Sequence, residues 1–428
     1  MNPAAGLVAR TRSLGGDVDL VSLCDDGDAL FSTNGVGILG VGSAARLLLA
    51  GGDRAHAGAV IATALASIEV DDEVSGPGTG PVALGALPFD PHADGELIVP
   101  RLVIGRGPHG SAWITTIATP DDEPTQGEIN EVLDRAGRVG TGFARDAGLH
   151  PSSDSPSHFA IQPLRSPEDW CDAVTEATRR LAAGAARKVV LARGVEITTD
   201  RPLRPSAVLS HLRRTFPASH LFSIDGFVGA TPELLVERSD AVVRAHPMAG
   251  TAPRSGDVET DARLSAALLA STNTRDEHRH TIDMVHDTLL PWCSYLDEEA
   301  EPSIVAMANV QHLGTRLEGR LSEPIASVLD LVGALHPTLA VGGMPRAAAI
   351  ELIGELESLD RGRFAGPVGW VDAEGNGTWA VGIRSAQIDG TRTRIHAGVG
   401  VVADSVAEQE LAETRAKLQT MLGAIVRP

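Results

Sequence analysis

The residues near the C-terminus combine two carboxylates, a lysine and two glycines at spacings that favour a binding site. Glu410, Glu413 and Lys417 recur on one side of an expected helix, at i, i+3 and i+7. The strand expected just before this helix has Gly398 and Gly400 on one face, where a ligand or another backbone can approach closely. We therefore expect one wall of a site for an anionic ligand that binds with the help of a metal ion.

Two residues far upstream have the chemistry of an acid–base pair. Lys188 opens an otherwise apolar strand, and Glu233 follows Pro232 at the start of another. A lysine at a strand end often extends its ammonium to solvent, but it acts as a base when desolvation or a nearby cation lowers its pKa. Glu233 is either an edge-strand charge or a buried general acid with a raised pKa. Both alternatives stay open at both positions.

Glu277 and Glu413 are suited to a hard metal ion. Glu277 lies in the first turn of an expected helix, where the helix dipole alone favours an acid. Two carboxylates without cysteine ligands suit a cation that keeps some of its waters, which favours Mg²⁺ over Zn²⁺. His312 lies between apolar residues, and the pattern alone predicts a hydrogen-bonded core histidine.

Arg384 and the pair Gly250–Thr251 add groups that can hold an anion. Arg384 is expected on a central strand of a C-terminal meander, where a cation is costly unless it is paired. Its partner is either a substrate carboxylate, bound in bidentate fashion, or a structural acid. Gly250 and Thr251 follow a strand, and backbone N–H groups at such a place can bind an anion.

A glycine motif in the N-terminal part resembles a phosphate-binding loop only in its spacing. Gly35, Gly37 and Gly40 form G-x-G-x-x-G, and Asp53 follows after 12 intervening residues. A dinucleotide-binding unit needs a full helix and a second strand before that acid. Because 12 residues are too few for both, we expect a glycine-rich strand or bulge here.

The elements that position these residues predict an α+β fold with antiparallel sheets. Strand-like runs bounded by glycine and proline turns are expected at 28–34, 59–70, 80–90 and 96–105. Ser166 caps an expected helix, and a Ser405–Glu408 capping box begins the last one. Further helices are expected at 205–216, 275–290, 325–335 and 346–357. Residues 120–160 read as a linker between a strand-rich part, 1–160, and a second part, 165–428, of one sheet system.

Composition and charge exclude several classes of function. With 36 basic and 56 acidic residues, the net charge is −20, which disfavours nonspecific binding to nucleic acid or anionic membranes. No signal-like pattern opens the chain, and no apolar run approaches membrane-spanning length. Cys24, Cys171 and Cys293 lack the spacing of a metal site or a disulfide framework. We expect a cytoplasmic protein that binds neither nucleic acid nor membrane.

Eight segments, taken in order, resemble the chorismate-utilising enzymes. They are KVVLAR, GATPELLV, PMAGTAPR, RDEHRHTIDMV, VQHL, LHPTLAVGGMP, FAGPVGWVDAEGNGTWAVGIRSA and HAGVGVVADSVAEQELAETRAKL. The resemblance covers roughly residues 165–425, the chorismate-binding catalytic region. It is looser before that, where GALPFD is the best fragment. It implies stacked, mostly antiparallel sheets flanked by helices, chorismate as the substrate, Mg²⁺ as the cofactor and isochorismate synthases as the most similar subgroup.

The resemblance also implies a role for each candidate residue. Lys188 would activate water for attack on C2 of chorismate, and Glu233 would protonate the departing C4 hydroxyl. Glu277 and Glu413 would hold Mg²⁺, which binds the ring carboxylate. His312 would line the ring site. The contacts to the two substrate carboxylates would come from Gly250, Thr251, Arg384, Gly398, Gly400 and Lys417.

A few positions discriminate among subgroups of this family. Lys188 favours water, since the anthranilate synthases, which use ammonia, lack a lysine there. Ala249 stands where aminodeoxychorismate synthases have a nucleophilic lysine. Ala340 and Val341 resemble the isochorismate synthases more than the salicylate-forming relatives. Thr274 stands where the family often has an acid, three residues before the metal glutamate.

The resemblance predicts a monomeric isochorismate synthase without a glutaminase subunit. One alternative is a salicylate synthase, which would continue by eliminating pyruvate in the same site. Another is a noncatalytic acidic binding protein on the same fold. Whether the product serves menaquinone, siderophore or other aromatic synthesis is left open.

Overall fold

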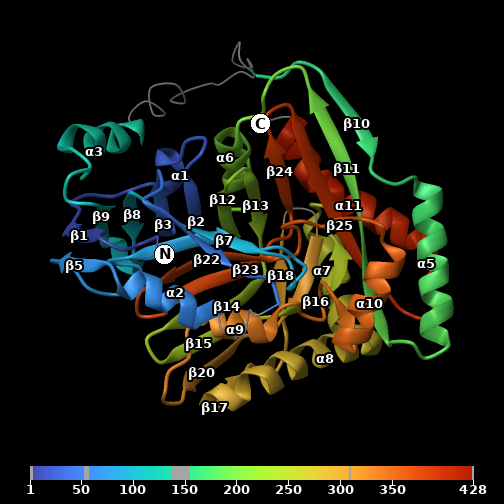
Figure 1. Ribbon diagram of the computed structural model, residues 1–428. Helices are drawn as coiled ribbons and strands as arrows, with labels where there is room; N and C mark the ends of the chain where they lie inside the picture. The colour runs from blue at the N-terminus through green and yellow to red at the C-terminus, as the bar shows by residue number, and fades with distance from the viewer. Residues whose placement is uncertain (1–2, 53–56, 137–154, 308–309, 427–428) are drawn as a thin grey trace.

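Strand pairing organises the protein into three sheets (Figure 1). The computed structural model describes residues 3–52, 57–136, 155–307 and 310–426. Within these ranges the sheets contain thirteen, nine and three strands. The β1–β5 pair is parallel, and the other neighbouring pairs of described strands are antiparallel. The predicted α+β fold with mostly antiparallel sheets is confirmed.

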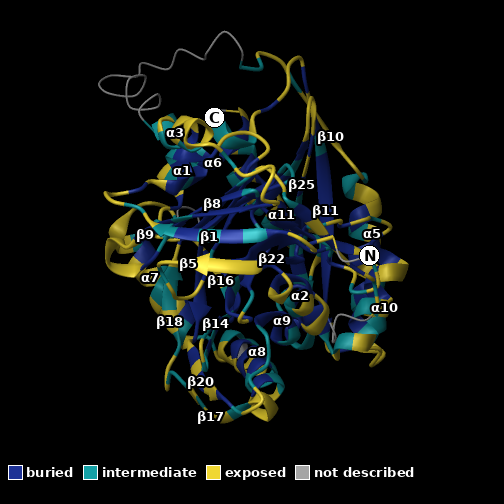
Figure 2. Cartoon of the chain, turned by 60° about the vertical axis from the view of Figure 1, so that its left-hand side comes forward, coloured by how far each residue is buried: buried dark blue, intermediate teal, exposed yellow. Residues whose placement is uncertain are grey.

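The thirteen-stranded sheet runs through both parts of the chain. Its order is β10 (Phe159–Pro163), β11 (Lys188–Thr199), β25 (Arg392–Val401), β24 (Ser385–Asp389), β13 (Phe227–Thr231), β12 (His220–Ile224), β2 (Ala29–Thr33), β3 (Val36–Val41), β8 (Leu102–Arg106), β9 (Ala112–Ala118), β1 (Val8–Ser13) and β5 (Glu69–Asp72). The short strand β21 (Gly343–Met344) pairs with the beginning of β11. Figure 2 shows β5 as a fully exposed edge.

The other two sheets supply the remaining strands. The nine-stranded sheet has the order β17 (Cys293–Glu298), β20 (Leu317–Leu321), β15 (Val242–His246), β14 (Leu234–Ser239), β23 (Gly377–Val381), β22 (Pro367–Asp372), β6 (Val82–Ala86), β7 (Gly95–Val99) and β4 (Ala45–Leu49). The three-stranded sheet has the order β16 (Met248–Pro253), β19 (Val310–Gly314) and β18 (Ser303–Ala306).

Helices cover the outer faces of these sheets (Figure 1). They are α1 (Leu20–Leu23), α2 (Ala57–Ala66), α3 (Gln126–Leu133), α5 (Pro167–Ala182), α6 (Pro205–Thr215), α7 (Val258–Ala270), α8 (Thr272–Leu289), α9 (Val328–Leu335), α10 (Arg346–Leu356) and α11 (Ala407–Val426). The described residues also include two single 3₁₀ turns, η2 (Pro108–Gly110) and η3 (Leu290–Trp292). In the ranges that the structure covers, no helix is long and apolar enough to cross a lipid bilayer.

Two apolar cores lie on opposite faces of the thirteen-stranded sheet. Along β2, Phe31 contributes to the core shared with the nine-stranded sheet and with α9 and α10. The adjacent Leu30 points to the other face and joins the core formed with α1, α6 and α11. This alternation is the two-residue period of a strand that is buried on both faces.

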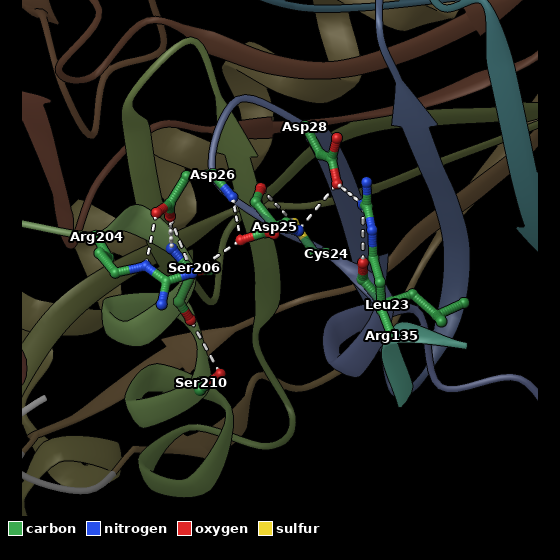
Figure 3. A network of polar contacts seen from close by, with 9 residues as sticks. All are labelled: Leu23, Cys24, Asp25, Asp26, Asp28, Arg135, Arg204, Ser206 and Ser210. Atoms are coloured by element: carbon green, nitrogen blue, oxygen red, sulfur yellow. Dashed lines mark hydrogen bonds and ion pairs between the residues drawn. The ribbon is translucent and has the colours of Figure 1, made fainter. Parts of the chain in front are cut away.

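The two parts of the chain share both large sheets. Strand β2 pairs with β12, and β6 pairs with β22. Figure 3 shows a polar contact that adds to this link. Asp26 accepts hydrogen bonds from the side chains of Arg204 and Ser206 at the start of α6. The same figure shows a contact within the first part, where Asp28 accepts a hydrogen bond from Arg135. The division near residue 160 stays a prediction, and residues 137–154 of the expected linker lie outside the described ranges.

Most predicted helices are confirmed, and three local predictions are wrong. The expected strand at 59–70 is mainly helix α2, because its alanine-rich run favours a helix. Helix α11 begins at Ala407, and Ser405 instead accepts a hydrogen bond from the backbone N–H of Val402. The central strand that was expected to contain Arg384 is interrupted, since β23 and β24 belong to different sheets.

The glycine motif lies mainly in a strand, as the sequence predicts, and the structure places that strand in a hairpin. Gly37 and Gly40 are in β3, which pairs with β2, and Gly35 lies in the turn between them. A Cβ at Gly37 would lie 2.1 Å from the carbonyl oxygen of Phe31. The glycine at 37 therefore serves close packing of the hairpin. Asp53 lies outside the described residues.

Candidate functional site

A cavity of about 340 Å³ gathers every residue that the sequence singled out for chemistry. This volume is within the range typical of small-molecule sites. The walls come from β11, β25, β16 and β19, from helices α8 and α11, and from five connecting segments. The predicted residues among its lining are Lys188, Glu233, Gly250, Thr251, Glu277, His312, Ala340, Val341, Arg384, Gly398, Gly400, Glu413 and Lys417.

The pairing of β11 with β25 places Lys188 over Gly400. Val190 is opposite Gly400 in this antiparallel register, so the side chain of Lys188 passes across the glycine. A Cβ at Gly400 would lie 2.4 Å from Cε of Lys188. The missing side chain at Gly400 thus makes room for a lysine. At Gly398, the backbone carbonyl accepts a hydrogen bond of 2.9 Å from Nζ of Lys417.

Two lysine–glutamate pairs lie in the cavity wall. Nζ of Lys188 is 2.5 Å from Oε1 of Glu277, and Nζ of Lys417 is 2.6 Å from Oε1 of Glu413. The lysine side chains are 14% and 13% exposed, whereas the two carboxylate side chains are 41% and 40% exposed. Burial lowers the pKa of Lys417, and Glu413 opposes this shift. The more exposed carboxylates are therefore the groups available to an incoming cation.

Glu233 is a buried carboxyl group on the connection between the two large sheets. It follows β13 of one sheet and precedes β14 of the other, and its side chain is almost completely buried. Its backbone N–H donates to the hydroxyl of Thr231. Burial raises the pKa of Glu233 to about 8, although Arg384 and Lys188 act in the opposite direction. The carboxyl is therefore mostly protonated at neutral pH and can donate a proton.

Arg384 lies on a second connection between the same sheets, which corrects the prediction of a central strand. It follows β23 and precedes β24, with a φ of 51°. This left-handed conformation is uncommon for arginine and turns the chain out of the sheet. Burial lowers the pKa of Arg384 to about 10, and the carboxylates of Glu413 and Glu233 oppose the shift. The guanidinium remains charged and interacts electrostatically with Glu413 and Glu233.

His312 and Gly250 meet where β19 pairs with β16. Nδ1 of His312 lies 3.2 Å from the carbonyl oxygen of Gly250 and 3.1 Å from the hydroxyl of Thr251. Burial lowers the pKa of His312 to about 3, so the ring is neutral. Gly250 has a φ of 75° at an irregularity in the strand pairing, and a Cβ there would lie 2.3 Å from Cγ2 of Thr274. A glycine is required at this position.

Ala340 and Val341 form a turn held against β11. The N–H groups of Val341 and Gly342 donate to the carbonyl of Thr338, at 3.2 and 2.9 Å. The N–H of Val190 then donates to the carbonyl of Gly342 at 2.8 Å. The turn and the strand that begins with Lys188 are thus directly joined.

The cavity also contains residues that sequence reasoning did not assign to it. Arg361, Phe364 and Ala365 line it from the segment before β22. Phe364 and Ala365 open one of the segments that carry the family resemblance, but no role was assigned to them, and no motif included Arg361. The lining also includes Glu410, which the helical spacing had already placed on the same side as Glu413. Its pKa is raised by burial first and then by Glu413, with a smaller contribution from Glu277. Glu410 is therefore close enough to interact electrostatically with both Glu413 and Glu277.

The donor chemistry of this wall suits a hard cation held mainly by carboxylate oxygens and water. Glu277 and Glu413 offer partly exposed oxygens that are now balanced by lysine ammonium groups. No cluster of three or more histidine, cysteine, aspartate or glutamate side chains in metal-binding geometry occurs in the described part of the chain. A site with two carboxylates fits an ion that keeps several waters, as Mg²⁺ does.

Comparison with known proteins gives a consistent result. The family model described as "Chorismate binding enzyme" matches residues 28–426. Isochorismate synthase DhbC of Bacillus subtilis is 35% identical over 356 residues, which cover 81% of each chain. Isochorismate synthase EntC of Escherichia coli is 32% identical over 349 residues, covering 80% of each. The structure of MenF, the menaquinone-specific isochorismate synthase of Escherichia coli, superposes with a TM-score of 0.79 over 99% of this chain and 95% of that one. At 23% identity, this last similarity establishes a shared fold.

Proposed function

The chain belongs to the chorismate binding enzyme family, and we propose that it is an isochorismate synthase. The observation that supports this most directly is that one cavity contains both a candidate acid and a candidate base. Glu233 is a buried carboxyl with a pKa of about 8, and Lys188 lines the same space. A protonated acid and an amine that can take up a proton are what the displacement of a hydroxyl by water requires.

A cation bound at Glu277 would take over the carboxylate that pairs with Lys188 and would favour loss of the ammonium proton. In the proposed reaction, Lys188 then acts as a neutral amine and accepts a proton from water as the water oxygen bonds to C2 of chorismate. The ring double bonds shift, the C4–O bond breaks, and Glu233 supplies the proton with which the hydroxyl leaves as water. The lysine gains one proton and the glutamic acid loses one, so the net change is a move of hydroxyl from C4 to C2. The reverse reaction uses the same groups with their roles exchanged.

The substrate is a dianion, and the cavity offers cations to bind it. We propose that Arg384 and Lys417, together with the backbone at Gly398, Gly400 and Gly250–Thr251, hold the two carboxylates. His312, which is neutral, would lie against the ring. Ala340 and Val341 would contact the substrate from the turn next to β11. A neutral wall beside the ring and charged groups at the carboxylates would orient C2 and C4.

We further propose that the cofactor is Mg²⁺, held by Glu277 and Glu413. When bound, the ion neutralises a carboxylate of the substrate and stabilises charge that develops in the ring. Glu410 would stabilise this arrangement from the next turn of α11. Oxygen ligands alone, rather than thiolates, support Mg²⁺ over Zn²⁺.

We propose that the enzyme works as a cytoplasmic monomer without a glutaminase subunit. The three cysteines are free, as expected in a reducing compartment. The use of water as nucleophile makes an ammonia-supplying partner unnecessary. Elution at the mass of a single 44.6 kDa chain in size-exclusion chromatography with light scattering would support the monomer, and a dimer mass would contradict it.

Separation of the products formed from chorismate tests the function. The protein is incubated with chorismate and Mg²⁺, and the mixture is resolved by liquid chromatography. Isochorismate in equilibrium with chorismate is expected. Salicylate with an equal amount of pyruvate would instead identify a salicylate synthase, and dependence on ammonia an amine-forming enzyme. No conversion would favour a binding protein.

A further inference from the structure

On one edge of β11, side chains bind the backbone at a place where no described strand pairs with it. Strand β21 pairs with its first two residues, and β10 pairs with residues 195–199. Between them, the carbonyl of Val190 accepts a hydrogen bond of 2.7 Å from Nη2 of Arg361. The N–H of Ala192 donates to Oε2 of Glu357 at 2.8 Å, and its carbonyl accepts from Nε1 of Trp170 at 3.2 Å. Side chains therefore replace backbone partners over this gap.

Glu357 and Arg361 form the charged part of this closure. Two hydrogen bonds of 2.6 Å join them in a bidentate pair, and their side chains are 1% and 3% exposed. A buried ion pair is stable only when its remaining polar atoms are also satisfied. Arg361 meets this need by donating to the carbonyls of Val190 and Val341, at 2.7 and 2.9 Å. Its guanidinium carbon also lies 4.1 Å from the ring centre of Phe89.

This pair joins two walls of the cavity. Val190 and Val341 both line it, and Lys188 is two residues before Val190 on the same strand. Through its two carbonyl bonds, the guanidinium sets the spacing between β11 and the Ala340–Val341 turn. Because Lys188 passes within close packing distance of Gly400, a shift of β11 would move its ammonium relative to the substrate.

We propose that Glu357 and Arg361 are positioning residues for the reaction, acting through Lys188 and Val341 without touching the reacting atoms. The proposal rests on the isochorismate synthase activity proposed above. The other edge of β11 pairs with β25, so these two side chains act on the one edge that faces the Ala340–Val341 turn. Small misplacements of a reacting group are costly to catalysis, about 10²-fold for 1 Å.

The double variant Glu357→Met/Arg361→Met separates positioning from stability. Replacing a buried ion pair by apolar side chains of similar size is often neutral or stabilising, so a Tm within a few degrees of the parent is expected. The kcat for chorismate should nevertheless fall by at least about tenfold, with KM changed much less. Parent-like kcat in the folded double variant would overturn the proposal.

A conservative variant covers the case in which the double variant does not fold. Arg361→Lys keeps a cation beside Glu357 but cannot span both carbonyls in a fork. Its kcat, measured well below its own Tm, should fall at least about tenfold. A kcat equal to that of the parent would contradict positioning. Arg135→Met removes a half-buried ion pair with Asp28, far from the cavity, and serves as the control. It should lower Tm and leave kcat unchanged.

Hydrogen exchange tests whether Glu357 and Arg361 restrain β11, and it does not depend on enzyme activity. In the double variant the N–H of Ala192 loses its carboxylate acceptor, so the peptide that contains β11 residues 188–193 should exchange faster than in the parent. Unchanged exchange there would remove the structural basis of the proposal. Failure of the parent to convert chorismate would instead refute the proposed function, and the exchange result would still stand.

Discussion

Lys188 and Glu277 form an ion pair of 2.5 Å although 89 residues separate them in the chain. The pair connects the first residue of β11 to the first turns of α8 and joins the proposed base to a proposed metal ligand. With the pair of Lys417 and Glu413, it balances the charges of the cavity wall. Binding of a dianion and a divalent cation would exchange these partners without a net change of charge.

Loss of Lys188 should abolish turnover and leave the fold intact. Lys188→Gln removes the group that takes the proton from water, so kcat should fall by about 10²- to 10⁴-fold. The product assay with chorismate and Mg²⁺ measures this, and circular dichroism checks folding. Arg187→Ala, at the exposed neighbouring position, is the control and should retain activity. Full turnover by the glutamine variant would exclude Lys188 as the base.

The activity should fall as the pH rises through about 8, because Glu233 then loses its proton. Only the protonated carboxyl can donate, and burial raises the pKa of Glu233 to about 8. A plot of log kcat/KM for chorismate against pH should bend downward near that value in the free enzyme. A profile that stays level to well above pH 9 would contradict this role.

The same group should make the protein less stable at alkaline pH. Between its unfolded pKa near 4.5 and its folded pKa of about 8, the folded state holds more protons than the unfolded state. The free energy of unfolding therefore decreases as the pH rises through this window. Glu233→Gln removes the titration, so its Tm should fall less than that of the parent between pH 5 and about pH 8.5. Parallel Tm curves for both proteins would argue against a raised pKa.

Gly400→Ala should impair catalysis by displacing Lys188. The new Cβ would lie 2.4 Å from Cε of Lys188, so the lysine has to adopt another position. We expect a loss of kcat of at least about tenfold. Gly398→Ala is a graded comparison, since its Cβ would meet Cγ1 of Val190 at 3.3 Å. Gly423→Ala, on an open helix surface, should be neutral or slightly stabilising. Equal activity of the 400 and 423 variants would show that the lysine is not displaced.

Glu413→Gln should abolish the Mg²⁺-dependent activity. The variant should stay folded, because the carboxylate side chain is 40% exposed and its partner Lys417 also donates to the carbonyl of Gly398. Titration of Mg²⁺ in the chorismate assay, with EDTA as the reverse test, measures the effect. Glu408→Gln, an exposed acid on the same helix, is the control. Undiminished parent activity in excess EDTA would exclude a metal role.

Much of the fold and the membership of the cavity were predictable from local sequence. Ser166 and Pro167 begin a helix because capping and a fixed φ act within one turn. The glycine-rich strand that contains Gly37 and Gly40 was predicted from its local sequence, and the stripe of Glu410, Glu413 and Lys417 follows from the period of a helix. The resemblance to a family then linked Lys188, Glu233 and Glu277, which no spacing could have joined.

The sequence alone determined which side chains are present and which faces of their elements they occupy, because these depend on backbone periods of a few residues. Tertiary structure decided their environments. Glu233 became an acid with a raised pKa only because its connection between sheets is buried. Arg384 left the expected strand because β23 and β24 belong to different sheets. Gly400 makes room for Lys188, and Arg361 holds β11 from 171 residues away. Burial and contacts between distant strands arise only when the sheets are assembled.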